Sequence, residues 1–167
     1  MHRNGVNFVR ILLGFAIAVG IAYVLAALFF TSANLIRLAA VGADISLSDA
    51  LRTYWFDLRG MAPSLVWTQY GTLIAIGFAI AFPVAAGLRS LAARSHSARR
   101  LAPYLYPLAG AAAITVILIR SYSEYEVFLI AGARGTVGWL AQCAAGAAGG
   151  YLFQLAIGRA NAQEVRA

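Results

Sequence analysis

The sequence Arg89-Ser-Leu-Ala-Ala-Arg94-Ser-His96-Ser-Ala-Arg99-Arg100 separates two long apolar segments and carries four arginines, one histidine and no carboxylate. A short loop with so many arginines is rarely moved across a bilayer. We therefore expect this arginine loop, residues 89–100, to be cytoplasmic and to orient every membrane span around it. Its arginines (Arg89, Arg94, Arg99 and Arg100) are placed to meet anionic lipid headgroups.

The composition also indicates a membrane protein. The chain has 167 residues, of which 62% are hydrophobic and 11% charged, and its mean hydropathy is +0.77. A soluble domain carries about a quarter charged residues, so this chain has too little polar surface to coat a water-soluble globule. We expect one integral membrane domain over residues 1–167.

The net charge of +7 and the pI near 10.2 would by themselves permit nucleic-acid binding. All of the basic side chains except the histidines are arginines, and their excess lies beside apolar segments rather than along one polar face. We therefore expect membrane lipids, and no nucleic acid, as the anionic partners.

Four apolar segments have the length that a helix needs to cross a hydrocarbon core of about 30 Å. They cover about residues 11–33, 65–88, 101–119 and 137–157. The first segment is longer than the apolar region of about 7–15 residues in a signal peptide, so we expect a retained helix. Pro83 is expected to kink the second span, and Tyr104 and Tyr106 to lie in the headgroup region.

A shorter helix is predicted between the first two spans, at about residues 47–59. Ser46 or Ser48 can cap it, and Asp49 lies in its first turn, where the helix dipole favours a carboxylate. Apolar and aromatic side chains recur along it at helical spacing: Leu47, Leu51, Tyr54, Trp55 and Leu58. This pattern predicts an amphipathic helix that lies on the outer membrane surface.

The distribution of charge predicts the topology. With both termini in the cytoplasm, eight arginines and one glutamate lie inside, whereas five arginines and five carboxylates lie outside. That excess of arginine on one side is the pattern of the positive-inside rule. The predicted fold is thus an all-α bundle of four transmembrane helices in a bacterial-type inner (cytoplasmic) membrane.

Small residues recur within the predicted spans at spacings that let helices approach closely. The candidate packing positions are Gly14, Ala18, Ala22, Gly77, Ala81, Gly146 and Gly150. Such stripes favour packing of the chain against itself, against a second copy or against other membrane proteins.

The sequence offers little chemistry. The lone Cys143 excludes an internal disulfide, both histidines lie outside the spans, and no span contains a carboxylate or an arginine. We expect no metal, no cofactor and no catalytic residue, and no motif singles out a family. Two looser groups remain, namely Thr115 and Gln142 as a possible polar lining, and an outer cluster of Arg120, Glu124, Glu126 and Arg134. For Gln142 we favour the alternative that its side chain packs and hydrogen-bonds to a neighbouring helix.

These features favour a non-catalytic accessory or assembly subunit of the inner membrane. The alternative is a small transporter or channel component with a path near Gln142 and Thr115. A lipid-modifying enzyme ranks last, because its active groups would have to be the carboxylates of the outer loops.

Overall fold

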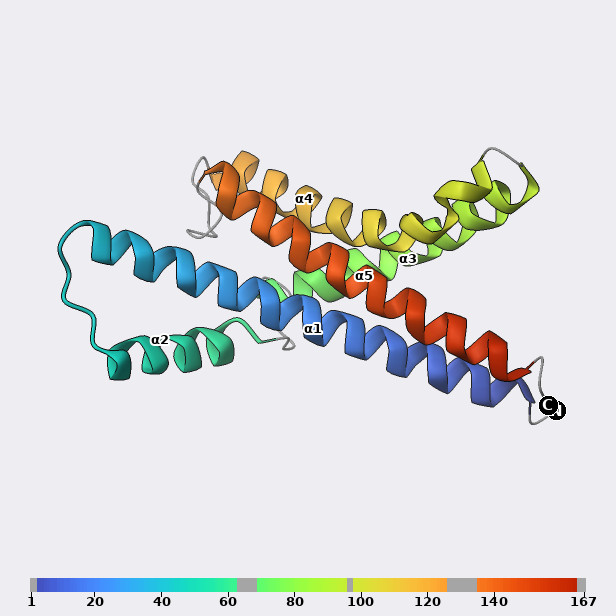
Figure 1. The fold of residues 1–167 in the computed structure, drawn as a ribbon, viewed down its shortest axis with the longest axis horizontal. Coiled ribbons are helices and arrows are strands. Elements are labelled where there is room, and N and C mark those ends of the chain that lie inside the picture. Colours follow the sequence, from blue (N-terminus) through green and yellow to red (C-terminus); the bar gives the residue numbers. More distant parts are fainter. Residues whose placement is uncertain (1–2, 63–68, 96–97, 126–134, 165–167) are drawn as a thin grey trace.

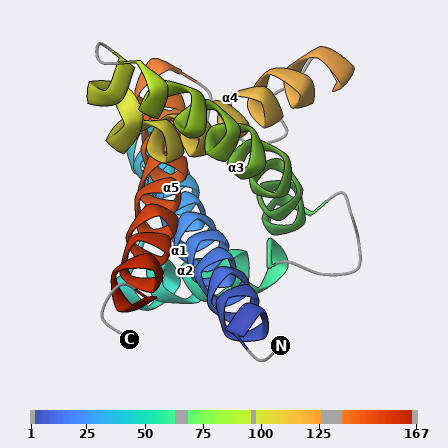
Figure 2. The same cartoon turned by 90° about the vertical axis from the view of Figure 1, so that its right-hand side faces the viewer.

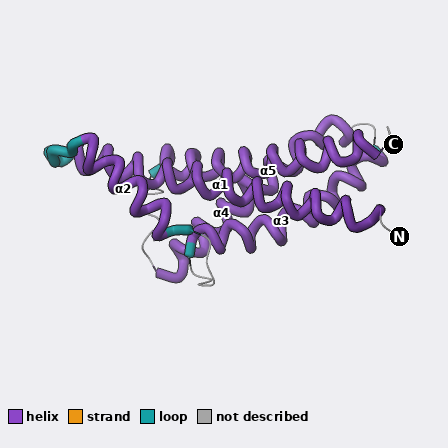
Figure 3. Tube along the Cα trace, turned by 90° about the horizontal axis from the view of Figure 1, so that it is seen from below, coloured by secondary structure: helices purple, strands orange, loops and turns teal. Residues whose placement is uncertain are grey.

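The structure is a computed structural model that describes residues 3–62, 69–95, 98–125 and 135–164. This part of the chain is helical apart from short turns and contains no strand (Figure 3). Its elements are α1 (Arg3–Ala40), α2 (Leu47–Gly60), α3 (Tyr70–Arg94), the 3-10 helix η1 (Ala98–Tyr104), α4 (Leu105–Tyr125) and α5 (Thr136–Glu164). Four helical segments are long and apolar enough to cross a membrane, so the predicted helical membrane fold is confirmed at that level.

Helix α5 packs against α1 on one side and α4 on the other, and α3 packs against α4. Helices α1 and α3 share a smaller contact. The pair α1–α5 and the pair α3–α4 cross near their middles and diverge towards the end that carries both termini (Figures 1 and 2). The core therefore lies at the crossing, and the bundle opens at one end.

Helix α1 is longer than the predicted span of residues 11–33. It runs from Arg3 to Ala40, a length of about 57 Å at 1.5 Å per residue. Its C-terminal end extends beyond the other long helices, and α2 folds back alongside it (Figure 1). The turn between them includes Gly42, whose φ of +87° is a conformation that glycine adopts without steric cost.

Helix α2 forms where the sequence predicts it, and Ser46 is its N-cap. The Ser46 side chain accepts a hydrogen bond from the Asp49 amide at 3.2 Å, while the Asp49 carboxylate accepts one from the Ser46 amide at 3.3 Å. This reciprocal capping box satisfies two amide groups that would otherwise lack partners at the helix start.

The observed ends of α4 differ from the predicted ones, both near the prolines and at the C-terminal end of the helix. The chain is a 3-10 helix through Pro103, and the α-helix begins at Leu105 rather than at residue 101. Pro107 then falls in the first turn of α4, where a missing amide hydrogen costs no helical hydrogen bond. At its other end α4 continues to Tyr125, beyond the predicted limit at residue 119.

The second span was predicted from residue 65, and α3 begins at Tyr70 after an N-cap at Gln69. Residues 63–68 lie outside the described part of the chain.

Candidate functional site

A buried polar network joins three of the long helices. The side chain of Gln142 on α5 is fully buried. Its Oε1 accepts a hydrogen bond from the Tyr70 hydroxyl of α3 at 2.9 Å, and its Nε2 donates to the Ala26 carbonyl of α1 at 3.0 Å. The sequence alone does not identify Tyr70 as a partner of Gln142, because a tyrosine near the end of a span is also typical of the membrane interface. The network satisfies both ends of the Gln142 amide inside the bundle.

Thr115, the other residue of the predicted polar lining, belongs to a different contact. Its hydroxyl donates to the Ala111 carbonyl at 3.0 Å and lies 3.2 Å from the Cys143 sulfur. Thr115 thus connects α4 to α5, whereas Gln142 connects α5 to α1 and α3. Thr115 lies on α4 and Gln142 on α5, and their hydrogen-bond partners differ, so the structure does not join them in one site.

The glycines of α5 make close contacts with the neighbouring helices. Gly146 faces Gly110 of α4 so closely that a Cβ on either residue would overlap the carbonyl of the other. Gly150 faces the Tyr106 carbonyl in the same way. On the α1 side, a Cβ at Gly149 would lie 2.8 Å from the Ala18 carbonyl oxygen. These glycines therefore set the spacing between helices of this chain.

The other candidate packing residues also lie at helix contacts. Ala18 and Ala22 of α1 are fully buried. A Cβ at Gly14 would lie 2.8 Å from Cβ of Ala156, and one at Gly77 would lie 3.3 Å from Cδ1 of Ile117. Ala81 is partly buried against the core.

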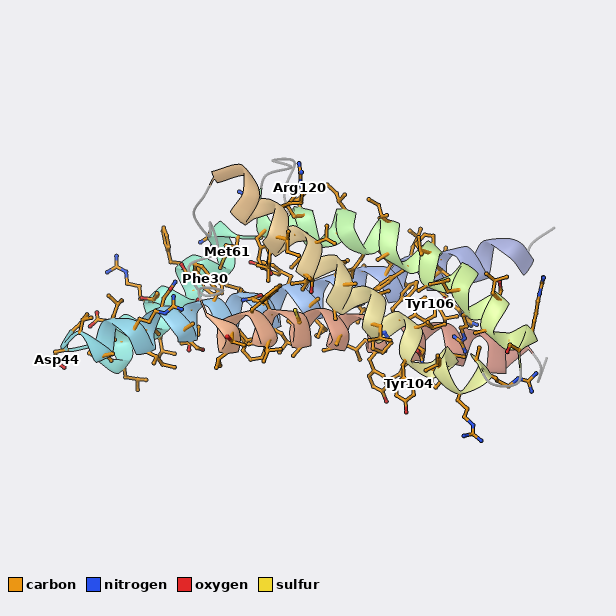
Figure 4. All side chains as sticks on the ribbon, turned by 90° about the horizontal axis from the view of Figure 1, so that it is seen from above. Phe30, Asp44, Met61, Tyr104, Tyr106 and Arg120 are labelled. Carbon is orange, nitrogen blue, oxygen red and sulfur yellow. The ribbon has the colours of Figure 1, made fainter. Side chains whose placement is uncertain are left out.

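An aromatic cluster fills the region where the two helix pairs begin to diverge. The rings of Phe82 and Phe153 stack with centroids 4.4 Å apart and planes 15° apart. Phe15 meets both rings edge-on, and Tyr106 does the same from α4. Tyr106 is buried among the helices, whereas Tyr104 projects outwards (Figure 4).

An apolar cleft of about 540 Å³ opens beside this cluster. Ile11, Leu12 and Phe15 of α1 form one wall, and the other wall is α3. The remaining lining residues are Phe78, Ala79, Phe82, Pro83, Ala86, Tyr106, Phe153 and Ile157. The cleft thus lies in the space between the diverging helix pairs, and aromatic rings from all four long helices line it.

Arg89 lies about one helical turn beyond Ala86, the last residue of α3 that lines this cleft. Its guanidinium carbon lies 5.9 Å from the centroid of the Tyr106 ring, a cation–π distance. Arg94, Arg99 and Arg100 are exposed around the end of α3 and on η1, and Arg99 donates to the Ala93 carbonyl at 3.3 Å. Arg89 is half-buried, so the four arginines of the loop have different surroundings.

The predicted outer cluster is described only in part. Arg120 is exposed near the C-terminal end of α4 (Figure 4), and Glu124 belongs to the last turn of that helix. Glu126 and Arg134 lie outside the described residues.

Helix α2 is attached to α1 through polar groups. The Thr31 hydroxyl donates to the Asp57 carboxylate at 2.8 Å, and the Ser32 and Tyr54 hydroxyls lie 2.8 Å apart. The Tyr23 hydroxyl donates to the Leu58 carbonyl. Sequence reasoning missed these contacts because Thr31 and Ser32 sit in an apolar run, where neither forms a recognisable motif.

The attachment leaves most of the apolar side of α2 uncovered. Leu47, Leu51, Trp55 and Phe56 are between 60% and 77% exposed. Tyr54 and Leu58, which the helical spacing groups with them, are less exposed and contact α1. The exposed apolar stripe of α2 is therefore Leu47, Leu51 and Trp55, which follow one another at four-residue spacing, whereas the exposed Phe56 lies on another side of the helix.

Within the described ranges, no group of three or more histidine, cysteine, aspartate or glutamate residues lies close enough to hold a metal ion. No protein-family model, curated protein or solved structure matches the chain.

Proposed function

We propose that the chain is a non-catalytic accessory or assembly subunit of a bacterial-type inner membrane, with both termini in the cytoplasm. Its partner is a second membrane protein or another copy of the chain. The partner-binding surface is the hairpin of α2 and the C-terminal end of α1. This assignment moves the contact surface away from the small-residue stripes, because their glycines and alanines contact helices of the same chain.

The length of α1 carries this proposal. From Ile11 to Leu38 the helix rises about 40 Å, which is about 10 Å more than the hydrocarbon core. Ile36 and Leu38, near the projecting end, are 68% and 50% exposed. Apolar side chains that extend beyond the hydrocarbon core are stabilised when another protein surface shields them from water. The exposed stripe of α2 lies on the same hairpin, so one partner can bury both.

The polar groups of the interior support the same role. Gln142 and Thr115 are the residues on which a transport path would depend, and both bond to groups of the chain itself. A permeating solute would have to break those bonds. The geometry therefore favours a structural use of these side chains over the transporter alternative.

The test is extraction of the full-length protein from its native membrane, followed by native mass spectrometry. We expect a complex of defined stoichiometry. Leu51→Glu places a charge in the exposed stripe of α2 and is expected to dissociate the complex. Thr53→Glu adds the same charge on the opposite side of the same helix, because Thr53 lies about 160° from Leu51 and Trp55 at 100° per residue, and it is expected to preserve the complex. A lipid-bound monomer in the unaltered protein, or equal behaviour of the two variants, contradicts the proposal.

The orientation requires its own measurement. Reporter domains fused after residue 95 and after residue 125 are expected to report opposite sides of the membrane, with residue 95 in the cytoplasm. Activity of both reporters on one side would overturn the proposed topology.

A further inference from the structure

The cleft between α1 and α3 has the shape and chemistry of a lipid site. It is open, apolar and lined by aromatic rings, and its volume of about 540 Å³ lies within the range of about 300–1,000 Å³ typical of ligand pockets. All four long helices contribute to its lining. The rings of Phe15, Phe82 and Phe153 belong both to the aromatic cluster and to the lining of the cleft. The packing of the helices therefore forms the cleft.

The spacing of residues along α3 matches one leaflet. Phe78 is the lining residue of α3 that is farthest from Arg89, which lies eleven residues further along the helix. That separation corresponds to about 16 Å along a helix axis, close to half of a hydrocarbon core of about 30 Å. An acyl chain that reaches Phe78 thus places its headgroup at the level of Arg89.

The charge at the open end selects the headgroup. Arg89 is held beside Tyr106, a residue that lines the cleft. Its neighbours in the arginine loop are also cationic, and the loop contains no carboxylate to neutralise them. A guanidinium at this depth binds a phosphate by charge-assisted hydrogen bonds and keeps its stem against apolar groups.

From these observations we infer that the cleft binds one anionic phospholipid, with an acyl chain between α1 and α3 and the phosphate at Arg89. This site is distinct from the general attraction of the arginine loop for anionic membranes, because it requires the apolar cleft as well as the charge. It does not depend on the partner-binding role proposed above.

The experiment titrates the purified full chain in neutral detergent with phosphatidylglycerol, phosphatidylcholine or glycerol phosphate, and follows the one-to-one adduct by native mass spectrometry. We expect phosphatidylglycerol to bind at least about fivefold more tightly than phosphatidylcholine, the discrimination that one basic residue provides. Glycerol phosphate, which carries the headgroup chemistry without chains, is expected not to compete.

Two pairs of variants measure separately how the charge of Arg89 and the open volume of the cleft contribute to lipid binding. Arg89→Gln is expected to weaken phosphatidylglycerol binding about fivefold, whereas Arg52→Gln, which removes the same charge from α2, leaves it unchanged. Ala86→Phe fills the cleft at an exposed position and is expected to abolish binding of both lipids. Ala144→Phe adds the same volume at an exposed position of α5 that does not line the cleft, and preserves binding.

Three results would overturn the inference. Equal weakening by Arg89→Gln and Arg100→Gln would show a diffuse attraction to the loop. Undiminished lipid binding by Ala86→Phe would show that the acyl chain does not occupy this cleft. Effective competition by glycerol phosphate would reduce the site to an anion site without an acyl chain.

Discussion

The Tyr70 hydroxyl donates to Oε1 of Gln142 at 2.9 Å, and the two residues are 72 positions apart in the sequence. Because Gln142 also donates to the Ala26 carbonyl, one side chain connects α1, α3 and α5 at the centre of the bundle. The Gln142 amide stabilises this helix arrangement because both its oxygen and its nitrogen are hydrogen-bonded. If the amide were removed, the Tyr70 hydroxyl would be buried without an acceptor.

Gln142→Leu is therefore expected to lower the free energy of unfolding by about 1–2 kcal/mol, because it leaves the Tyr70 hydroxyl without its acceptor. Adding Tyr70→Phe to this variant is expected to cost little more, since the two groups share one interaction. Unfolding in mixed detergent micelles measures both values. Fully additive losses in the double variant would contradict the pairing.

The same substitution elsewhere on α5 is expected to act in the opposite direction. Oε1 of Gln154 is buried and accepts no hydrogen bond from the described residues. Gln154→Leu removes that unsatisfied atom and is expected to raise the free energy of unfolding by about 1 kcal/mol. The thermal unfolding of Gln154→Leu and Gln142→Leu can be compared directly. A loss of stability in Gln154→Leu would mean that Oε1 has a partner in the membrane.

The close approach of α4 and α5 predicts a strong penalty for a single methyl group. Gly146→Ala forces its Cβ into the Gly110 carbonyl and is expected to cost about 1–3 kcal/mol, the usual range for overpacking. Gly87→Ala on α3 is the matched control, because a Cβ there meets no atom within 4 Å. It is expected to be neutral or to stabilise the helix. Chemical denaturation of both variants distinguishes the two outcomes, and equal effects would contradict the packing.

The attachment of α2 to α1 predicts a local effect on dynamics. Thr31→Val removes the hydroxyl that donates to Asp57 and is expected to weaken this attachment by about 1 kcal/mol. Hydrogen exchange of residues 47–60 is then expected to accelerate about fivefold, with the rest of the bundle unchanged. Thr115→Val, which alters a contact of α4 with α5, is expected to leave that exchange rate unaffected. Unchanged exchange in Thr31→Val would mean that other contacts hold α2.

The sequence alone determined the four long apolar helices, because lipid requires every backbone amide to be satisfied within a helix over about 20 residues. It also predicted α2 and restricted its N-cap to Ser46 or Ser48, of which the structure uses Ser46, because capping signals lie within a few residues of the helix start. These features are local, and their signals lie in neighbouring residues.

Only the tertiary structure decided how the side chains are used. The sequence offered Gln142 as either a lining or a packing residue, and the choice depended on Tyr70 and Ala26, which other helices place beside it. In the same way, Phe15, Phe82 and Phe153 are ordinary apolar residues within three separate spans. They become one aromatic cluster, with an apolar cleft beside it, only when the helices cross and diverge. Helix crossing depends on which surfaces can approach most closely, a property of pairs of helices that no single segment contains.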